Sequence, residues 1–161
     1  MFVVGIIALL MLAFFLRGGK LHNLLVLASE RVFQNAGFLT DQESPKRLPD
    51  GKLDFIDLLV CRDRFLIAIE VETSARSVLS NALKAEQFGS RLWVVVPNRK
   101  VQKAIQEKLC NRDLQPAGEP IRVLLLAQLQ QEVMKCFPLS SAAYKQGEEQ
   151  KNKSGEESHA D

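Results

Sequence analysis

The chain has 161 residues, 47% of them hydrophobic, and a formal net charge of +2. This length provides one globular domain with a sizeable core and excludes two domains of ordinary size. The small net charge does not by itself require a nucleic-acid partner, although a slightly basic body precedes an acidic tail. Three cysteines without a CxxC spacing argue against a disulfide framework and a zinc site, and are typical of a reducing compartment.

The chain begins with an unbroken apolar run from Met1 to Leu16, followed by Arg17 and Lys20. As a helix this run is roughly 24 Å long, a little less than the ~30 Å hydrocarbon core of a bilayer, so it can cross with the help of snorkelling Arg and Lys side chains or local thinning. The absence of charge before Arg17 and of a small-residue cleavage site argues against a cleaved signal peptide. We therefore expect residues 1–18 to be a transmembrane anchor. Because the basic residues follow the run, the positive-inside rule predicts a single-pass membrane protein with its domain in the cytoplasm.

The next segments predict a helix and the start of a sheet. Residues 21–36 place apolar side chains at three- and four-residue steps, which predicts an amphipathic helix ending at Gly37. Residues 38–48 are polar and contain Pro45, typical of an irregular or edge strand. Residues 53–61 and 65–73 predict two strands joined by a tight polar hairpin. The second is apolar on both faces as far as Glu70, which is typical of a central, covered strand.

The remaining segments alternate between helix and strand. Residues 74–88 predict a helix, and residues 92–96 an apolar strand ended by a proline. A helical crossover between two strands implies a right-handed β-α-β unit with parallel strands. A further helix, strand and helix are expected at 100–110, 121–126 and 127–134. We therefore expect an α/β domain with a mixed central sheet over residues 19–138 and a disordered polar tail over residues 139–161.

Carboxylates interrupt the two apolar strands where a core strand would carry Val or Ile, and an unpaired buried carboxylate is costly. Glu70 and Glu72 are two residues apart and therefore share one face of their strand. Asp57 lies on the preceding antiparallel strand, and the short hairpin can bring it into register with Glu70. Such a cluster of oxygen ligands predicts a bound Mg²⁺ or Mn²⁺ ion. A metal-bound water could then attack a phosphorus atom.

The helix that follows offers a positive group. Ser77, Asn81 and Lys84 are four and three residues apart and share its polar side. If this side faces the carboxylates, Lys84 can stabilise the charge that develops on a pentavalent phosphate or orient the attacking water. Solvent-exposed strand ends and an ordinary surface lysine are the simpler alternatives. His22 and His159 have no partners at triad or metal-ligand spacing, so no chemistry is assigned to them.

The segments Ile56–Val60 and Ile67–Glu72, with the helix and strand after them, resemble the PD-(D/E)XK nuclease superfamily over about residues 21–126. The resemblance implies a restriction-endonuclease-like α-β-β-β-α-β core, a metal ion held by Asp57 and Glu70, and hydrolysis of DNA. It also implies that Glu30 matches an acidic residue that some members carry on the first helix. Glu72 stands where the family usually has lysine. Some members carry that lysine on the following helix, where this chain has Lys84.

The function expected from the sequence is therefore that of a membrane-anchored, metal-dependent nuclease acting on DNA. Its expected partners are DNA and the membrane, and a homodimer is compatible with the sequence. One alternative is a catalytically inactive nuclease fold that binds DNA or a protein at the membrane, which Glu72 in the lysine position favours. A second alternative is a component of a membrane assembly whose sheet only mediates contacts.

Overall fold

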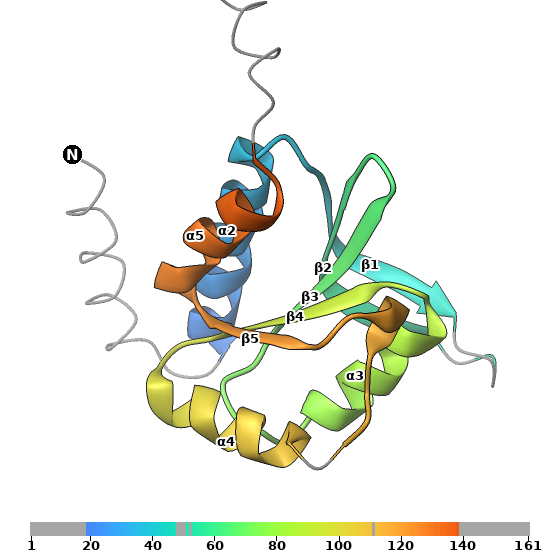
Figure 1. The fold of residues 1–161 in the computed structure, drawn as a ribbon, viewed down its shortest axis with the longest axis vertical. Coiled ribbons are helices and arrows are strands. Elements are labelled where there is room, and N and C mark those ends of the chain that lie inside the picture. Colours follow the sequence, from blue (N-terminus) through green and yellow to red (C-terminus); the bar gives the residue numbers. More distant parts are fainter. Residues whose placement is uncertain (1–18, 48–50, 52, 111, 139–161) are drawn as a thin grey trace, which may run out of the picture.

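A five-stranded sheet, with strand order β1-β2-β3-β4-β5, forms the central layer of the protein (Figure 1). The computed structural model describes residues 19–47, 51, 53–110 and 112–138. The elements in chain order are α2 (Gly19–Asn35), β1 (Leu39–Arg47), β2 (Leu53–Arg62), β3 (Phe65–Val71), α3 (Val78–Gln87), β4 (Arg91–Val96), α4 (Arg99–Leu109), the 3-10 turn η1 (Pro116–Gly118), β5 (Arg122–Leu125) and α5 (Leu126–Cys136).

The expected anchor at residues 1–18 and the expected tail at residues 139–161 both lie outside the described residues. Of the helices that the structure describes, none is long and apolar enough to span a bilayer.

The sheet is mixed, as the sequence predicts. β1 pairs with β2 and β2 pairs with β3 in antiparallel fashion, whereas β3, β4 and β5 run parallel to one another. The change of direction follows from the connections: a tight turn joins β2 to β3, and α3 carries the chain over from β3 to β4. The predicted β-α-β unit is therefore present.

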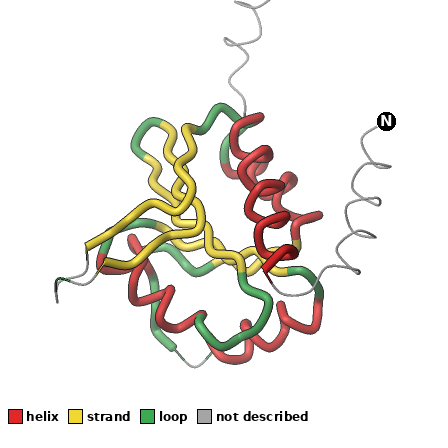
Figure 2. Tube along the Cα trace, turned by 180° about the vertical axis from the view of Figure 1, so that it is seen from behind, coloured by secondary structure: helices red, strands yellow, loops and turns green. Residues whose placement is uncertain are grey.

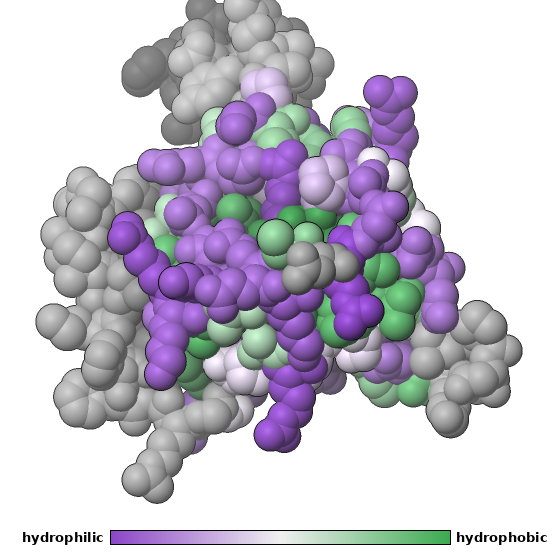
Figure 3. Space-filling view, turned by 60° about the horizontal axis from the view of Figure 1, so that its bottom comes forward, coloured by the Kyte–Doolittle hydropathy of each residue, from purple (hydrophilic) through white to green (hydrophobic). Residues whose placement is uncertain are grey.

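Helices cover both faces of the sheet (Figures 1 and 2). Alternate side chains of β4 enter opposite layers: Trp93 and Val95 pack on the α2 and α5 side, whereas Leu92 and Val94 pack on the α3 and α4 side. Such a strand must be apolar along its whole length, which explains the uninterrupted run in the sequence. On the face formed by α3 and α4, hydrophilic side chains cover most of the outer surface (Figure 3).

The start of α3 differs from the sequence-based prediction, whereas the edge strand agrees with it. The helix predicted from residue 74 begins only at Val78, because the preceding residues form a loop whose Ala75 and Arg76 carbonyl oxygens accept hydrogen bonds from Lys108 Nζ. The polar segment after α2 forms the nine-residue edge strand β1, which Glu43 interrupts with a φ of 47°, so the predicted irregular or edge strand is confirmed. Its position at the edge of the sheet permits Pro45, since one side of an edge strand needs no hydrogen-bond donors.

Candidate functional site

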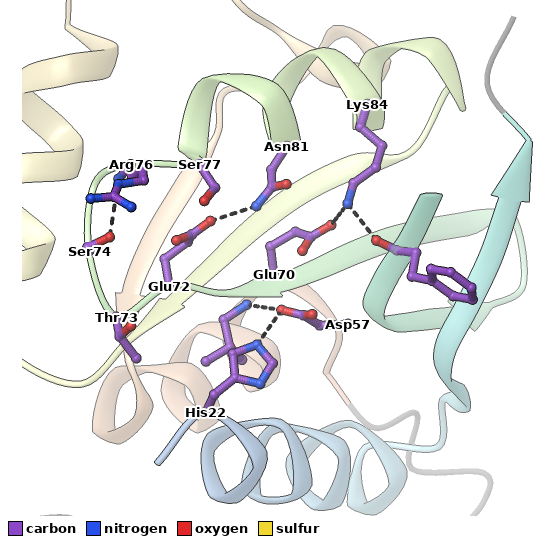
Figure 4. A pocket seen from close by; sticks show the side chains of 12 residues that line it. His22, Asp57, Glu70, Glu72, Thr73, Ser74, Arg76, Ser77, Asn81 and Lys84 are labelled. Carbon is purple, nitrogen blue, oxygen red and sulfur yellow. Dashed lines mark hydrogen bonds and ion pairs between the residues drawn. The ribbon is translucent and has the colours of Figure 1, made fainter. Parts of the chain in front are cut away.

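A pocket of about 390 Å³ lies where β3 ends and α3 begins (Figure 4). Side chains from α2, β2, β3, α3 and the loop before α3 meet there. The lining residues are His22, Phe55, Asp57, Glu70, Val71, Glu72, Thr73, Ser74, Arg76, Ser77, Asn81 and Lys84. The pocket therefore contains the carboxylates that the sequence analysis selected and the proposed lysine.

Asp57 lies where β2 and β3 separate. The ladder between these strands ends at the pair Leu58↔Ile69. Beyond it, Asp57 Oδ2 accepts a hydrogen bond of 2.8 Å from the backbone N–H of Val71. A carboxylate thus replaces the carbonyl of a neighbouring strand as acceptor, and an ionised acceptor makes this bond stronger. The separation leaves a gap between the strands at the mouth of the pocket.

The alternation of side chains along β2 is also reversed at Asp57. Leu58 packs on the α2 and α5 side of the sheet, yet Ile56, two residues earlier, packs on the α3 and α4 side. In a regular strand these two side chains would point the same way. Opposite Asp57, Glu43 of β1 has a φ of 47° and interrupts the ladder between the pairs Gln42↔Leu58 and Ser44↔Ile56. Left-handed backbone at a non-glycine residue costs about 1–3 kcal/mol and is concentrated at functional sites.

Glu70 and Lys84 form a buried ion pair. Lys84 Nζ lies 2.8 Å from Glu70 Oε1, and the side chains are 7% and 5% exposed. Lys84 Nζ also donates to the carbonyl oxygen of Phe55 at 2.6 Å and lies 3.7 Å from Asp54 Oδ2. Among the described residues, Glu70 Oε1 therefore has this ion pair and no further hydrogen-bond partner. Burial, followed by the charge of Asp57, raises the pKa of Glu70 to about 8.

Glu72 lies just past the end of β3 and faces the same helix. Its Oε1 accepts a hydrogen bond of 2.7 Å from Asn81 Nδ2, and its backbone N–H donates to the carbonyl of Val95. Burial and the charge of Asp57 raise the pKa of Glu72 to about 6. Each carboxylate of the pocket therefore has its own partner: Glu70 meets a lysine, Glu72 an amide, and Asp57 a backbone N–H.

His22 is a pocket residue that the sequence analysis set aside. Its Nε2 lies 3.0 Å from Asp57 Oδ2, which joins the first turn of α2 to β2. Helical spacing was the available signal, because His22 precedes the buried Leu25 and Val26 by three and four residues and so shares their side of the helix. Its partner, which is 35 residues away in the sequence, could not be deduced from that spacing.

Of the predicted supporting residues Glu30 and Ser77, only Ser77 lines the pocket. Glu30 is not among the residues that line the pocket; its two carboxylate oxygens accept hydrogen bonds from Thr40 and Gln42 on β1. Ser77 does line the pocket, at the N-terminus of α3, and its side chain makes no capping hydrogen bond. Arg76, which was not selected from the sequence, adds a basic group beside it.

The pocket fits a divalent cation in the kind of its ligands. Within the described residues, no three His, Cys, Asp or Glu side chains converge as a ready ligand set. However, Glu70 Oε1 is buried and, among the described residues, is held only by its ion pair with Lys84, and both bonds to Asp57 use Oδ2, which leaves Oδ1 out of them. Carboxylate oxygens of this kind are the ligands of Mg²⁺ and Mn²⁺, which also retain several waters.

These features define a mixed α/β protein with buried acids and a buried lysine in one pocket. No protein-family model matches the chain, and no curated protein matches it. Among solved structures, it is similar to the protein of unknown function AF1548, with a TM-score of 0.46 and 16% identity over 64% of this chain and 58% of that one. It is also similar to protein VC1899 from Vibrio cholerae, with a TM-score of 0.46 and 13% identity over 73% of this chain and 33% of that one.

Proposed function

We propose that the chain is a divergent PD-(D/E)XK nuclease that hydrolyses DNA phosphodiester bonds with Mg²⁺ or Mn²⁺. The observation that carries the proposal is the meeting of Asp57, Glu70 and Lys84, from two neighbouring strands and the following helix, in one pocket. A lysine and a glutamate buried together on a surface pocket are costly to maintain for stability alone, since apolar residues of similar size often replace such pairs without loss. The burial of Glu70 and Lys84 in this pocket is therefore explained more simply by a functional role than by stability.

In this proposal Asp57 and Glu70 would hold the cation, and Glu72 would support it or hold a second one. The bound ion would supply an activated water and a Lewis acid for the phosphate oxygens. Lys84 Nζ, already aimed at Glu70, would neutralise negative charge as it develops on the phosphate. Asn81 would orient Glu72, and Ser77 and Arg76 would be available to the phosphates at the pocket mouth.

A second candidate is an inactive nuclease fold that binds DNA or a protein. It is favoured by the direct contact of Glu70 with Lys84, which neutralises the buried carboxylate without a cation. It is also favoured by Glu72 in the position where the family usually carries lysine.

We also propose that residues 1–18 anchor the protein in a membrane as a single pass, with residues 19–138 in the cytoplasm. The support is the apolar run that Arg17 and Lys20 follow. The expected result is that the full chain stays in the membrane fraction after alkaline extraction, whereas a chain without residues 1–16 is released. Equal release of both chains would contradict the anchor.

Activity is tested with the full-length chain, purified in detergent and incubated with supercoiled, linear and branched DNA in Mg²⁺, Mn²⁺ or EDTA. The expected result is metal-dependent cleavage that Asp57→Asn and Glu70→Gln abolish. The matched control is Asp63→Asn at the far end of the same strand pair, where the side chain is 78% exposed and asparagine tolerates the φ of 55°. Equal behaviour of all four proteins would remove the nuclease proposal; metal-independent DNA binding without cleavage would favour the inactive module.

A further inference from the structure

A second, smaller groove of about 200 Å³ adjoins the carboxylate pocket, and His22 and Asp57 line both. It lies between the start of α2 and the strands β1 and β2. Its other lining residues are Asn23, Val26, Leu27, Gln42 and Glu43. A ligand that reaches from one to the other must pass the His22–Asp57 contact.

The side chains of the groove do not suit a phosphate. None of its described lining residues is a lysine or an arginine, and Glu43 and Asp57 both carry carboxyl groups. The carboxylate pocket also carries carboxyl groups, but unlike the groove it contains two basic side chains, Lys84 and Arg76. Negative charge on a ligand therefore belongs in the pocket, and the part of the ligand that enters the groove carries no negative charge.

The groove does suit a flat heterocycle. Leu27 is 47% exposed and, with Val26, offers an apolar surface. Asn23 and Gln42 add amides, and amides hydrogen-bond to base edges. The hydrogen bond from Gln42 Nε2 to Glu30 Oε2 fixes the orientation of this amide. The groove volume of about 200 Å³ is sufficient for one nucleobase.

We infer that this groove binds the nucleobase beside the phosphate that the carboxylate pocket holds. The inference rests on the proposed function and adds a substrate class to it: a strand with at least one base unpaired at the site, since a base within a duplex is stacked and cannot enter a side groove. A free strand end, a single-stranded segment or a distorted duplex would meet this requirement. An intact duplex would not.

The experiment measures binding of labelled single-stranded 12-mers by fluorescence anisotropy, with the full-length chain in a Glu70→Gln background that prevents cleavage. One nucleotide at a time is replaced by an abasic analogue. Leu27→Ala is compared with Leu83→Ala, which removes a leucine of similar exposure, 51%, from α3, outside both cavities. Asn23→Ala is a second groove variant at an exposed position, and thermal melting of each variant verifies folding.

Leu27→Ala is expected to weaken binding about fivefold, because it removes roughly 40 Å² of apolar contact with the base. Leu83→Ala is expected to leave binding unchanged. One abasic position should weaken the parent by a similar factor and produce no further loss in Leu27→Ala. A flat abasic scan, with Leu27→Ala and Asn23→Ala equal to Leu83→Ala, overturns the base-binding groove but leaves the nuclease proposal in place. Absence of DNA binding in this background, together with absence of cleavage by the chain that retains Glu70, overturns both.

Discussion

His22 Nε2 lies 3.0 Å from Asp57 Oδ2, and the same oxygen accepts a hydrogen bond from the N–H of Val71. The carboxylate is thus fixed from two directions, by a helix on one side and by a neighbouring strand on the other. This arrangement leaves Asp57 Oδ1 as the oxygen available to a cation in the proposed site. If a cation binds there, His22 would act on it through Asp57.

His22→Ala is expected to weaken Mn²⁺ binding about tenfold, because loss of a residue that orients a ligand commonly weakens metal binding by 10–100-fold. His22→Gln, whose amide nitrogen can take the place of Nε2, is expected to restore most of the affinity. Calorimetric titration with Mn²⁺ in the absence of DNA measures both. Equal affinities for the alanine variant and the parent would show that Asp57 does not depend on His22 for its orientation.

The raised pKa of Glu70 predicts that stability falls as pH rises. Between the ordinary value of 4.5 and about 8, the unfolded chain releases the proton of Glu70 while the folded chain retains it. The free energy of unfolding therefore decreases across this window, by a few kcal/mol, and levels off above it. Glu72 contributes in the same direction between 4.5 and about 6.

Denaturant titrations at pH 5, 6, 7 and 8 test this dependence. Glu70→Gln cannot ionise, so its stability is expected to change less with pH than that of the parent. Glu86→Gln, on the exposed face of α3, is the matched control and should follow the parent. Addition of Mg²⁺ is expected to flatten the parent profile if the cation binds the ionised carboxylate. Parallel pH profiles for the parent and Glu70→Gln would contradict the prediction.

Lys84→Met is expected to destabilise the protein by up to about 3–5 kcal/mol well above pH 8, where Glu70 is ionised in the parent and would lose its counter-charge. Near pH 5 the effect should be smaller, because Glu70 is then protonated. The double variant Lys84→Met, Glu70→Gln should recover much of the loss. Lys103→Met, at a lysine that is 79% exposed, is the control. Denaturant titration of the four proteins completes a double-mutant cycle, and additive effects would show that the two side chains do not interact.

Phe33→Ala tests the core that supports α2. The Phe33 side chain is fully buried, with its ring 5.2 Å from that of Phe38 and 5.7 Å from that of Trp93. The expected loss is about 3–5 kcal/mol of unfolding free energy. Phe55→Ala, at a side chain that is 50% exposed, should cost far less. A small effect at Phe33 would mean that the α2 layer contributes little to stability.

The order of helices and strands could be predicted because hydrophobic periodicity reports which side of an element is buried. The run Leu92–Val96 predicts a strand covered on both faces, and β4 has this environment. The start of α3 could not be predicted, because Ser74 and Ser77 are both acceptable first residues and a hydrogen bond from distant Lys108 holds the intervening loop. The length of β1 depends on pairing with β2 rather than on its own polar sequence.

In the candidate site, too, some contacts could be predicted from the sequence and others could not. Periodicity of two on a strand and of three to four on a helix relates Glu70 to Glu72 and Asn81 to Lys84. The contact between Asp57 and His22 has no such local signal, since it depends on how α2 packs against β2. Glu30 shows the limit of the family resemblance: it lies on the expected helix, but its carboxylate is bound by β1 and is outside the pocket.

The gap between β2 and β3 beyond Leu58 also has a consequence for the order of assembly. The side chains around it, from Asp57 to Lys84, belong to one hairpin and the helix after it, so closing short loops brings them together. His22 lies 35 residues before Asp57 and joins them only when α2 packs against the sheet. The carboxylate pocket can therefore form before α2 packs against the sheet. The hydrogen bond between His22 and Asp57 forms only when α2 packs against the sheet. Detachment of α2 would therefore disorder the site while the rest of the sheet stays folded.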